Sequence, residues 1–236
     1  LFFIFGIDID IGCLILQMMV QYNMDLKRLE NILIDMDGVL LDTAYDNHFW
    51  QEHIPTRYAE LKSMNIDQAI KITHSLFHYK KGYKDWYDLD YWSNMLGLDI
   101  EQEKLSANMI DKIKLKKGAI DFLEKYHKEK NLFLVTNAHR KTLNIKMKKF
   151  PLIKYFKKII CSHELKYVKE EIPFWFILRN KLGVDYDKSV LIEDTIDNVK
   201  SAYHAGLKSI LISDVTINFR DTTCIQDLSS FSSSLK

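Results

Sequence analysis

Two aspartates spaced two residues apart, Asp35 and Asp37, are the residues of this sequence best suited to chemistry on phosphorus. They stand at the end of a short apolar run, and Gly38 follows directly. Gly38 permits a sharp turn, so both carboxylates can reach one site instead of opposite faces of a strand. One carboxylate can attack a phosphate ester, while the second protonates the leaving oxygen and later activates water. Taken alone, the pattern is also compatible with a simple polar turn.

Three other polar residues could bind a phosphate group. Thr136 and Asn137 offer a hydroxyl and the N–H groups of a turn to phosphate oxygens. Lys169 offers a positive charge that could neutralise phosphate and position the nucleophile. Each signal is weak alone, because a Thr-Asn pair after a strand is usually a turn and most lysines are solvated.

The adjacent acids Glu193 and Asp194 could belong to a metal site. They follow another apolar run, where carboxylates are costly unless they are paired or metal-bound. Asp194, the Asp35 carboxylate and the backbone carbonyl of Asp37 would form a set of hard oxygen ligands suited to Mg²⁺. Such an ion would reduce the repulsion between the nucleophile and a phosphate dianion.

These groups follow short apolar runs with the character of buried strands. We predict five strands, over Ile32–Asp35, Leu132–Thr136, Lys158–Cys161, Val190–Ile192 and Ser209–Ile212. Helical spacing separates most of them, over Ala119–Lys128, Phe174–Leu182 and Ile196–Ala205. Strands that alternate with helices predict an α/β fold, a doubly wound parallel sheet with a Rossmann-like core. In such a sheet ligands bind at the carboxyl ends of the strands, which is where the polar groups stand.

The long gap between the first two predicted strands indicates an inserted α-helical cap. The segment is rich in aromatic residues and mostly helical in pattern, and a structureless loop of that length is improbable. We expect a cap over residues 45–114 and an α/β phosphatase core over 24–44 and 115–236. Residues 1–23 could pass for a signal peptide or a membrane span, but Asp8 and Asp10 interrupt their apolar run and no Lys or Arg precedes it. We expect them to be a non-native or disordered extension instead.

The composition is that of an ordinary soluble protein. Of the 236 residues, 47% are hydrophobic and 28% charged, and the formal net charge is +1, which argues against a nucleic-acid partner. Three cysteines in no metal-ligand or paired spacing favour free thiols in a reducing compartment. We therefore expect a cytoplasmic protein, either a monomer or a homodimer, with no membrane association.

In their joint order, the four polar groups resemble the motifs of the haloacid dehalogenase superfamily. The resemblance covers about residues 31–215 and implies a magnesium-dependent phosphatase. It implies that Asp35 is the nucleophile, Asp37 the general acid and base, and Asp194 a metal ligand. It further implies that Thr136 and Lys169 bind phosphate and that Glu193 sits beside the metal, through a water. The Asp at position 37 points to phosphoryl transfer rather than dehalogenation.

Four other segments resemble the bacterial GMP/IMP nucleotidase branch, which dephosphorylates purine nucleoside 5′-monophosphates. They are Asp46–Trp50, Trp86–Trp92, Leu96–Ile100 and Thr136–His139. The sequence departs from that branch at Val39, Arg140 and Glu193, which leaves the substrate less defined than the reaction. The alternatives are a sugar-phosphate phosphatase or phosphomutase of the same superfamily, and an inactive nucleotide-binding protein.

The substrate-reading residues are expected in the cap and beside the second motif. Trp86 could stack on a purine base, and His48 or His139 could reach the ribose or phosphate. Each aromatic side chain of the cap is also compatible with a purely structural place in its core. The lysine-rich run Lys141–Lys149 is expected to be a solvated helix face.

Overall fold

The computed structural model describes residues 27–220 and 222–231, so the expectation for residues 1–23 lies outside the described part of the chain. A parallel sheet forms the core, with the strand order β3-β2-β1-β4-β5-β6. The strands are β1 (Asn31–Ile34), β2 (Asn131–Thr136), β3 (Lys158–Cys161), β4 (Ser189–Glu193), β5 (Lys208–Ile212) and β6 (Thr223–Ile225). The predicted α/β class and its five strands are confirmed, and the edge strand β6 is an addition.

The register brings the carboxyl ends of the central strands together. Ile34, the last residue of β1, pairs with Leu134 on one side and Ile192 on the other. Asp35 therefore begins the loop at the centre of the sheet, where the topology reverses direction. This switch point is the usual ligand site of an open parallel sheet.

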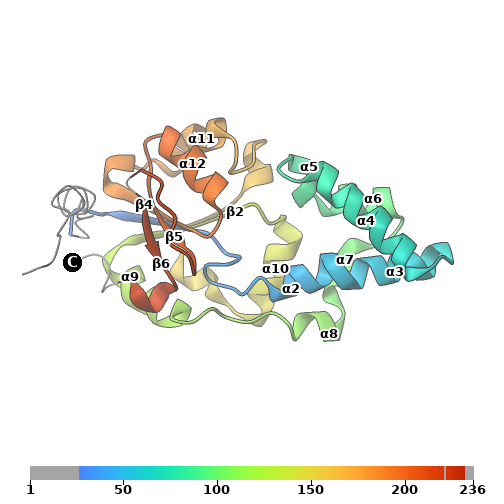
Figure 1. Ribbon diagram of the computed structural model, residues 1–236. Helices are drawn as coiled ribbons and strands as arrows, with labels where there is room; N and C mark the ends of the chain where they lie inside the picture. Colours follow the sequence, from blue (N-terminus) through green and yellow to red (C-terminus); the bar gives the residue numbers. More distant parts are fainter. Residues whose placement is uncertain (1–26, 221, 232–236) are drawn as a thin grey trace, which may run out of the picture.

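Helices cover both faces of the sheet because alternate strand residues point in opposite directions. Ile32 and Ile34 pack toward α9 (Ala119–Glu129) and α10 (Arg140–Lys149). Leu33 packs toward α11 (Ile172–Leu182) and α12 (Ile196–His204) on the opposite face. Figure 1 shows α11 and α12 above the sheet and α9 below it. Full burial of each such aliphatic side chain contributes about 1.5–3 kcal/mol to folding.

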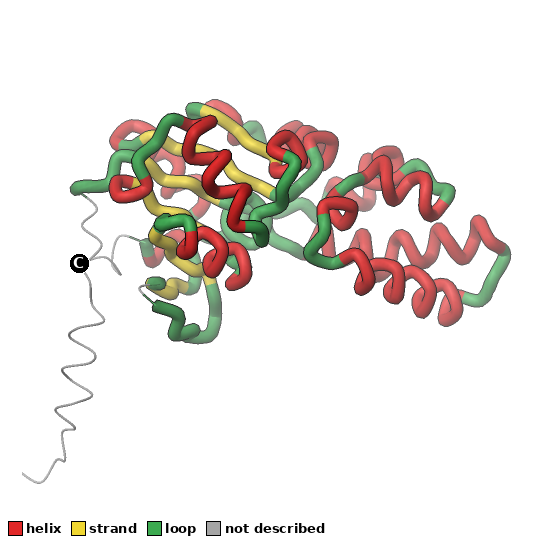
Figure 2. Tube along the Cα trace, turned by 90° about the horizontal axis from the view of Figure 1, so that it is seen from above, coloured by secondary structure: helices red, strands yellow, loops and turns green. Residues whose placement is uncertain are grey.

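A helical insert lies between β1 and α9 and extends from one end of the core (Figures 1 and 2). It comprises α2 (Ala44–His48), a π-helical turn (Phe49–His53), α3 (Ile54–Lys62), α4 (Ile66–Lys80), α5 (Lys84–Tyr87), α6 (Leu89–Leu96), α7 (Ile100–Leu105) and α8 (Ala107–Ile110). Side-chain caps begin several of these helices. Asn65 accepts a hydrogen bond from the Asp67 N–H, and Asp88 accepts from the Asp90 N–H.

The two chain segments that join the insert to the core lie side by side. Leu41 and Leu115 form an antiparallel bridge. The Asp42 N–H donates to the Lys114 carbonyl at 2.9 Å, and the Lys116 N–H donates to the Leu40 carbonyl at 2.9 Å. Both chain connections between the insert and the core therefore run through one hydrogen-bonded ribbon.

Short 3₁₀ turns complete the core, at Leu152–Tyr155, Ser162–Leu165, Tyr186–Lys188 and Leu228–Ser230. Within the described ranges, no helix has both the length and the apolar character that crossing a membrane requires.

Candidate active site

The loop after β1 places Asp35 and Asp37 at the mouth of the core. Asp35 stays attached to the sheet, because its N–H donates to the Ile192 carbonyl at 3.0 Å. Gly38 turns the chain with a φ of +81°, and a Cβ on Gly38 would lie 1.8 Å from Asp194 Oδ2. Only glycine allows this close approach, so the turn presses the loop against the end of β4.

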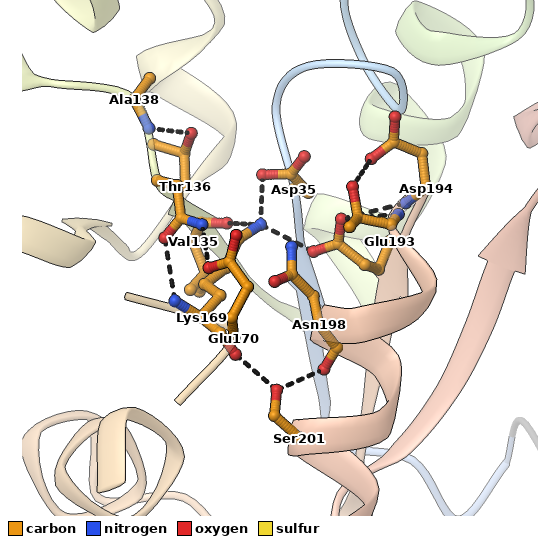
Figure 3. A network of polar contacts seen from close by, with 12 residues as sticks. Asp35, Val135, Thr136, Ala138, Lys169, Glu170, Glu193, Asp194, Asn198 and Ser201 are labelled. Carbon is orange, nitrogen blue, oxygen red and sulfur yellow. Dashed lines mark hydrogen bonds and ion pairs between the residues drawn. The ribbon is translucent and has the colours of Figure 1, made fainter. Parts of the chain in front are cut away.

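A buried lysine joins the ends of three strands. The Lys169 Nζ donates to Asp35 Oδ1 at 2.6 Å, to Glu193 Oε2 at 2.7 Å and to the Val135 carbonyl at 3.3 Å. Lys169 is 1% exposed, and Figure 3 shows it between the two carboxylates. Burial would lower the pKa of Lys169, but Asp35 and Glu193 raise it above its usual value. Lys169 is therefore a permanent cation beside the proposed nucleophile.

The acids of this cluster carry more negative charge than Lys169 can balance. Burial raises the pKa of Asp35 to about 7, although Lys169 opposes the rise. Burial likewise raises the pKa of Glu193 to about 7. The pKa of Asp194 is also raised, by burial and then by the charge of Asp35. An additional cation would stabilise these carboxylates in their charged forms.

The donor set fits a hard divalent cation. Asp35, Glu193 and Asp194 each offer a carboxylate oxygen, and these atoms lie within 4.8 Å of one another. Glu193 Oε1 accepts the N–H groups of Asp194 and Thr195 at 3.1 Å, and its Oε2 accepts from Lys169. Both Glu193 oxygens are thus engaged by the protein, whereas Asp35 and Asp194 each keep an oxygen available. Mg²⁺ prefers such carboxylate oxygens together with waters.

Thr136 and Asn137 lie beside the Lys169 cluster. Thr136 Oγ1 accepts a hydrogen bond of 3.0 Å from the Ala138 N–H, which shapes the turn after β2. Asn137 Oδ1 accepts from the Lys169 N–H at 3.0 Å, and Asn137 Nδ2 donates to Glu170 Oε2 at 2.8 Å. The Asn137 side chain therefore ties two loops together, and Thr136 also lines the cavity.

A cavity of about 720 Å³ connects these groups to the insert. From the core it is lined by Asp35, Asp37, Thr136, Asn137, Ala138, His139, Thr142, Lys169, Asp194, Thr195 and Asn198. From the insert and the segment leading into it, the lining residues are Thr43, Asp46, Asn47, Trp50, Gln51, His74, Phe77, Trp86, Tyr87, Leu89 and Lys104. The mixed lining gives the cavity a charged floor and an aromatic wall.

The three predicted substrate-reading residues have different positions. Trp86 and His139 line the cavity, whereas His48 lines a separate one of about 460 Å³ and pairs with Glu52 at 3.0 Å. His139 begins α10, where its Nδ1 accepts from the Lys141 N–H, and its ring stacks on His163. Burial lowers the pKa of His139, which favours the neutral imidazole.

Several aromatic residues of the insert form one connected cluster. Trp92 and Phe49 are fully buried and belong to its core. Trp86 packs edge-on against Phe77 and Trp92, with ring centroids 6.1 and 6.3 Å away, while also lining the cavity. Trp50 occupies a similar double position. These rings thus hold the insert together and present one edge of the cluster to the site.

The expectation that Lys141–Lys149 is a solvated helix face is wrong at Lys146. Lys146 is 1% exposed and contacts two carboxylates, Asp37 and Asp46. It lies on the face of α10 that also buries Leu143 and Met147. Positions 143, 146 and 147 share one helix face, so the spacing of Leu143 and Met147 indicated that the Lys146 side chain points toward the core.

Two other features were not foreseen from the sequence, one contact and one buried polar atom without a partner among the described residues. The Tyr87 hydroxyl, in the insert, donates to Glu170 Oε1 in the core at 2.6 Å. Asn198 is 4% exposed and lines the cavity, and no described residue provides a hydrogen bond to its buried Oδ1. Asn198 thus presents a polar atom that a bound water or ligand could satisfy.

Comparison with known proteins gives concordant results. A family model described as haloacid dehalogenase-like hydrolase matches residues 32–212. The GMP/IMP nucleotidase YrfG of Escherichia coli is 30% identical over 190 residues, which cover 80% of this chain and 85% of that protein. A phosphorylated carbohydrates phosphatase of Thermotoga maritima is 23% identical, over 77% of this chain and 84% of that protein. Among solved structures, a HAD phosphatase from Thermococcus onnurineus superposes with a TM-score of 0.76 at 21% identity, covering 87% of this chain and 97% of its own.

Proposed function

Because this chain belongs to the haloacid dehalogenase-like hydrolase family, we propose that it is a magnesium-dependent phosphomonoester hydrolase with Asp35 as its nucleophile. The observation that carries this proposal is the position of Asp35. It lies at the floor of the cavity, bound at 2.6 Å to the buried cation of Lys169 and beside Asp194.

The reaction would proceed in two displacements at phosphorus. One carboxylate oxygen of Asp35 attacks the phosphate, the bond from phosphorus to the ester oxygen breaks, and Asp37 gives its proton to that leaving oxygen. Water then attacks the phosphorus of the aspartyl-phosphate, and Asp37 takes one proton from this water. Phosphate leaves and the Asp35 carboxylate is restored, so the net reaction consumes one water.

The protein groups around the phosphate would stabilise its charge in both steps. Lys169 and the Thr136 hydroxyl donate toward its oxygens. The metal residues would be Asp35, Asp194 and the Asp37 backbone carbonyl, with Glu193 outside direct coordination. When bound, Mg²⁺ would supply positive charge against the transferring group. Lys169 also orients Asp35, since its ammonium holds one carboxylate oxygen at 2.6 Å.

A purine nucleoside 5′-monophosphate is the substrate we propose. The 30% identity to a GMP/IMP nucleotidase supports this class over a sugar phosphate. The aromatic edge formed by Trp50, Phe77 and Trp86 would offer a base a stacking surface worth about 1–3 kcal/mol. Such substrates are cytoplasmic metabolites, and the free thiols of Cys161 and Cys224 suit a reducing compartment.

The test is phosphate release from a panel of phosphomonoesters by the purified protein, with Mg²⁺ and with EDTA. The panel contains GMP, IMP, AMP, UMP, glucose phosphates and phosphoglycolate, and Asp35→Asn is the catalytic control. We expect magnesium-dependent release that is fastest with GMP or IMP and lost in Asp35→Asn. Faster release from sugar phosphates would reject the nucleotidase assignment while keeping the reaction. Release by Asp35→Asn at the wild-type rate would reject the nucleophile.

A further inference from the structure

Lys146 is a buried cation held between two carboxylates. Its Nζ lies 2.5 Å from Asp37 Oδ1 and also donates to Asp46 Oδ2. The other oxygen of Asp46 accepts from Lys104 at 2.9 Å, and Lys104, like Lys146, is 1% exposed. The four side chains form one alternating chain of charges, Asp37–Lys146–Asp46–Lys104, which runs from the loop after β1 to α7 of the insert.

The charge of Lys146 is secured by this arrangement. Burial would lower the pKa of Lys146, but the carboxylates of Asp37 and Asp46 raise it above its usual value. Burial would raise the pKa of Asp46, but the two lysines together bring it below its usual value. Both members of the pair therefore stay ionised, and each holds the other in place.

The contact leaves Asp37 with one oriented oxygen. Lys146 occupies Oδ1, and the described residues provide no hydrogen bond to Oδ2. Asp37 lines the cavity, so Oδ2 is the oxygen through which it can exchange a proton with a substrate. Because proton transfer requires heavy atoms within about 2.6–3.2 Å, the rotation of this carboxylate matters.

Stability alone does not require an ionic network here. Apolar residues that replace every member of a buried ion pair often cause no loss of stability, and α10 is already held by Leu143 and Met147. Lys146 differs from an apolar residue at this position because it donates a hydrogen bond to Oδ1 of Asp37 and so fixes the orientation of that carboxylate.

We propose that Lys146 is a positioning residue, which fixes the carboxylate of Asp37 so that its free oxygen faces the leaving oxygen of the substrate. The inference rests on the proposed function, since it requires Asp37 to serve as the general acid. It predicts that the need for Lys146 depends on how strongly the leaving group needs a proton.

Two esters with different leaving groups test this role. The 5′-oxygen of GMP is strongly basic and must be protonated as it leaves, whereas p-nitrophenolate leaves without a proton. The value of kcat/KM reports the steps up to cleavage of the ester bond, so it isolates the acid role of Asp37. We compare Lys146→Met with wild type on both esters, and Lys148→Met, an exposed position on the same helix, serves as the matched control.

We expect Lys146→Met to lower kcat/KM for GMP by about 10- to 100-fold and to change it by less than about threefold for p-nitrophenyl phosphate. Lys148→Met should leave both values unchanged. An equal loss on both esters would show a merely structural effect and overturn the inference. Failure of the wild-type protein to hydrolyse either ester with Mg²⁺ would overturn the proposed function itself, and the inference with it.

A second variant covers the case in which Lys146→Met does not fold. Lys146→Arg keeps the positive charge but moves the donor atoms. It should therefore lower kcat/KM for GMP relative to kcat/KM for p-nitrophenyl phosphate, as Lys146→Met does, but by a smaller factor. Circular dichroism confirms the fold of each variant at the assay temperature. If the folded Lys146→Arg protein has the same kcat/KM as wild type for GMP and the same ratio of kcat/KM for GMP to that for p-nitrophenyl phosphate, Lys146 does not position Asp37.

Discussion

The Tyr87 hydroxyl of the insert donates a hydrogen bond of 2.6 Å to Glu170 of the core, the residue that directly follows Lys169. Glu170 accepts a second hydrogen bond, of 2.8 Å, from Asn137. The phenol of α5 is thus connected through one carboxylate to the loop after β2. Because all three residues surround the cavity or adjoin it, this contact holds the insert against the core at the site.

Tyr87→Phe should weaken closure of the insert while leaving the fold intact. A hydrogen bond to a charged acceptor contributes modestly, so we expect kcat/KM for the substrate to fall by up to about tenfold. Steady-state kinetics measure the change, with Tyr79→Phe, an exposed tyrosine of the same insert, as the control. Identical kinetics for the two variants would show that the contact has no part in catalysis.

Gly38→Ala should displace Asp194 and remove magnesium-dependent activity. The new Cβ would lie 1.8 Å from Asp194 Oδ2, which forces the proposed metal ligand away. Gly183→Ala is the matched control, because Gly183 also has a positive φ, of +70°, but has no atom within 4 Å of the added Cβ. Both variants carry backbone strain of about 1–3 kcal/mol. Only Gly38→Ala should lose phosphate release and magnesium affinity, and equal losses would contradict this reading.

Magnesium should stabilise the protein more at pH 8 than at pH 5.5. Burial raises the pKa of Asp35 from 3.8 to about 7 and that of Glu193 from 4.5 to about 7. Without metal the folded state therefore binds more protons than the unfolded state between about pH 4 and 7, and stability falls as the pH rises through this window. Metal binding needs the deprotonated carboxylates, so protons compete with it at low pH.

Thermal unfolding in EDTA and in Mg²⁺ at the two pH values measures this effect. The increase in melting temperature with Mg²⁺ should be larger at pH 8 and absent in Asp194→Asn. The same increase at both pH values would show that these carboxyl groups do not titrate in this range.

Asp46→Asn should destabilise the fold strongly, because it leaves two buried lysines without their shared partner. Removal of one partner from a buried ion pair costs about 3–5 kcal/mol. Asp85→Asn, which removes the partner of the more exposed Lys80, should have a much smaller effect. Urea unfolding at pH 7 gives both free energies. The pKa of Asp46 lies below its usual value, so its contribution is present at neutral pH and is lost as the pH falls below about 4. Equal effects of the two substitutions would contradict the buried network.

The sequence predicted the core of the sheet well because each strand is a short apolar run that ends in a polar group. The positions of Asp35, Thr136 and Glu193 at strand ends follow from that pattern alone. Strand β6 was missed because Thr223–Ile225 is short and only its last residue is buried, so it lacks the apolar signal of an inner strand.

Contacts between the insert and the core could not be read from the sequence. The partners Tyr87 and Glu170 are separated by 83 residues, and Lys146 and Asp46 by 100. Their meeting depends on how the helices of the insert fold back over the sheet, which local spacing does not encode. His48 is a similar case. It lies close to Asp35 and Asp37 in the sequence, but its position in the sequence does not determine which cavity its side chain lines.

The hydrogen-bonded ribbon at Leu41 and Leu115 has a consequence for how this architecture can change. Both ends of the insert leave the core at neighbouring points. With respect to chain connectivity, the whole insert therefore occupies the place of one long hairpin turn. Another segment whose ends meet at the same spacing could leave the sheet at the same points, provided that it also supplied a carboxylate for the buried Lys146 and a partner for Glu170. Recognition of the substrate and chemistry at phosphorus are thus coupled through these contacts, and a grafted insert would have to reproduce them to keep Asp37 in position.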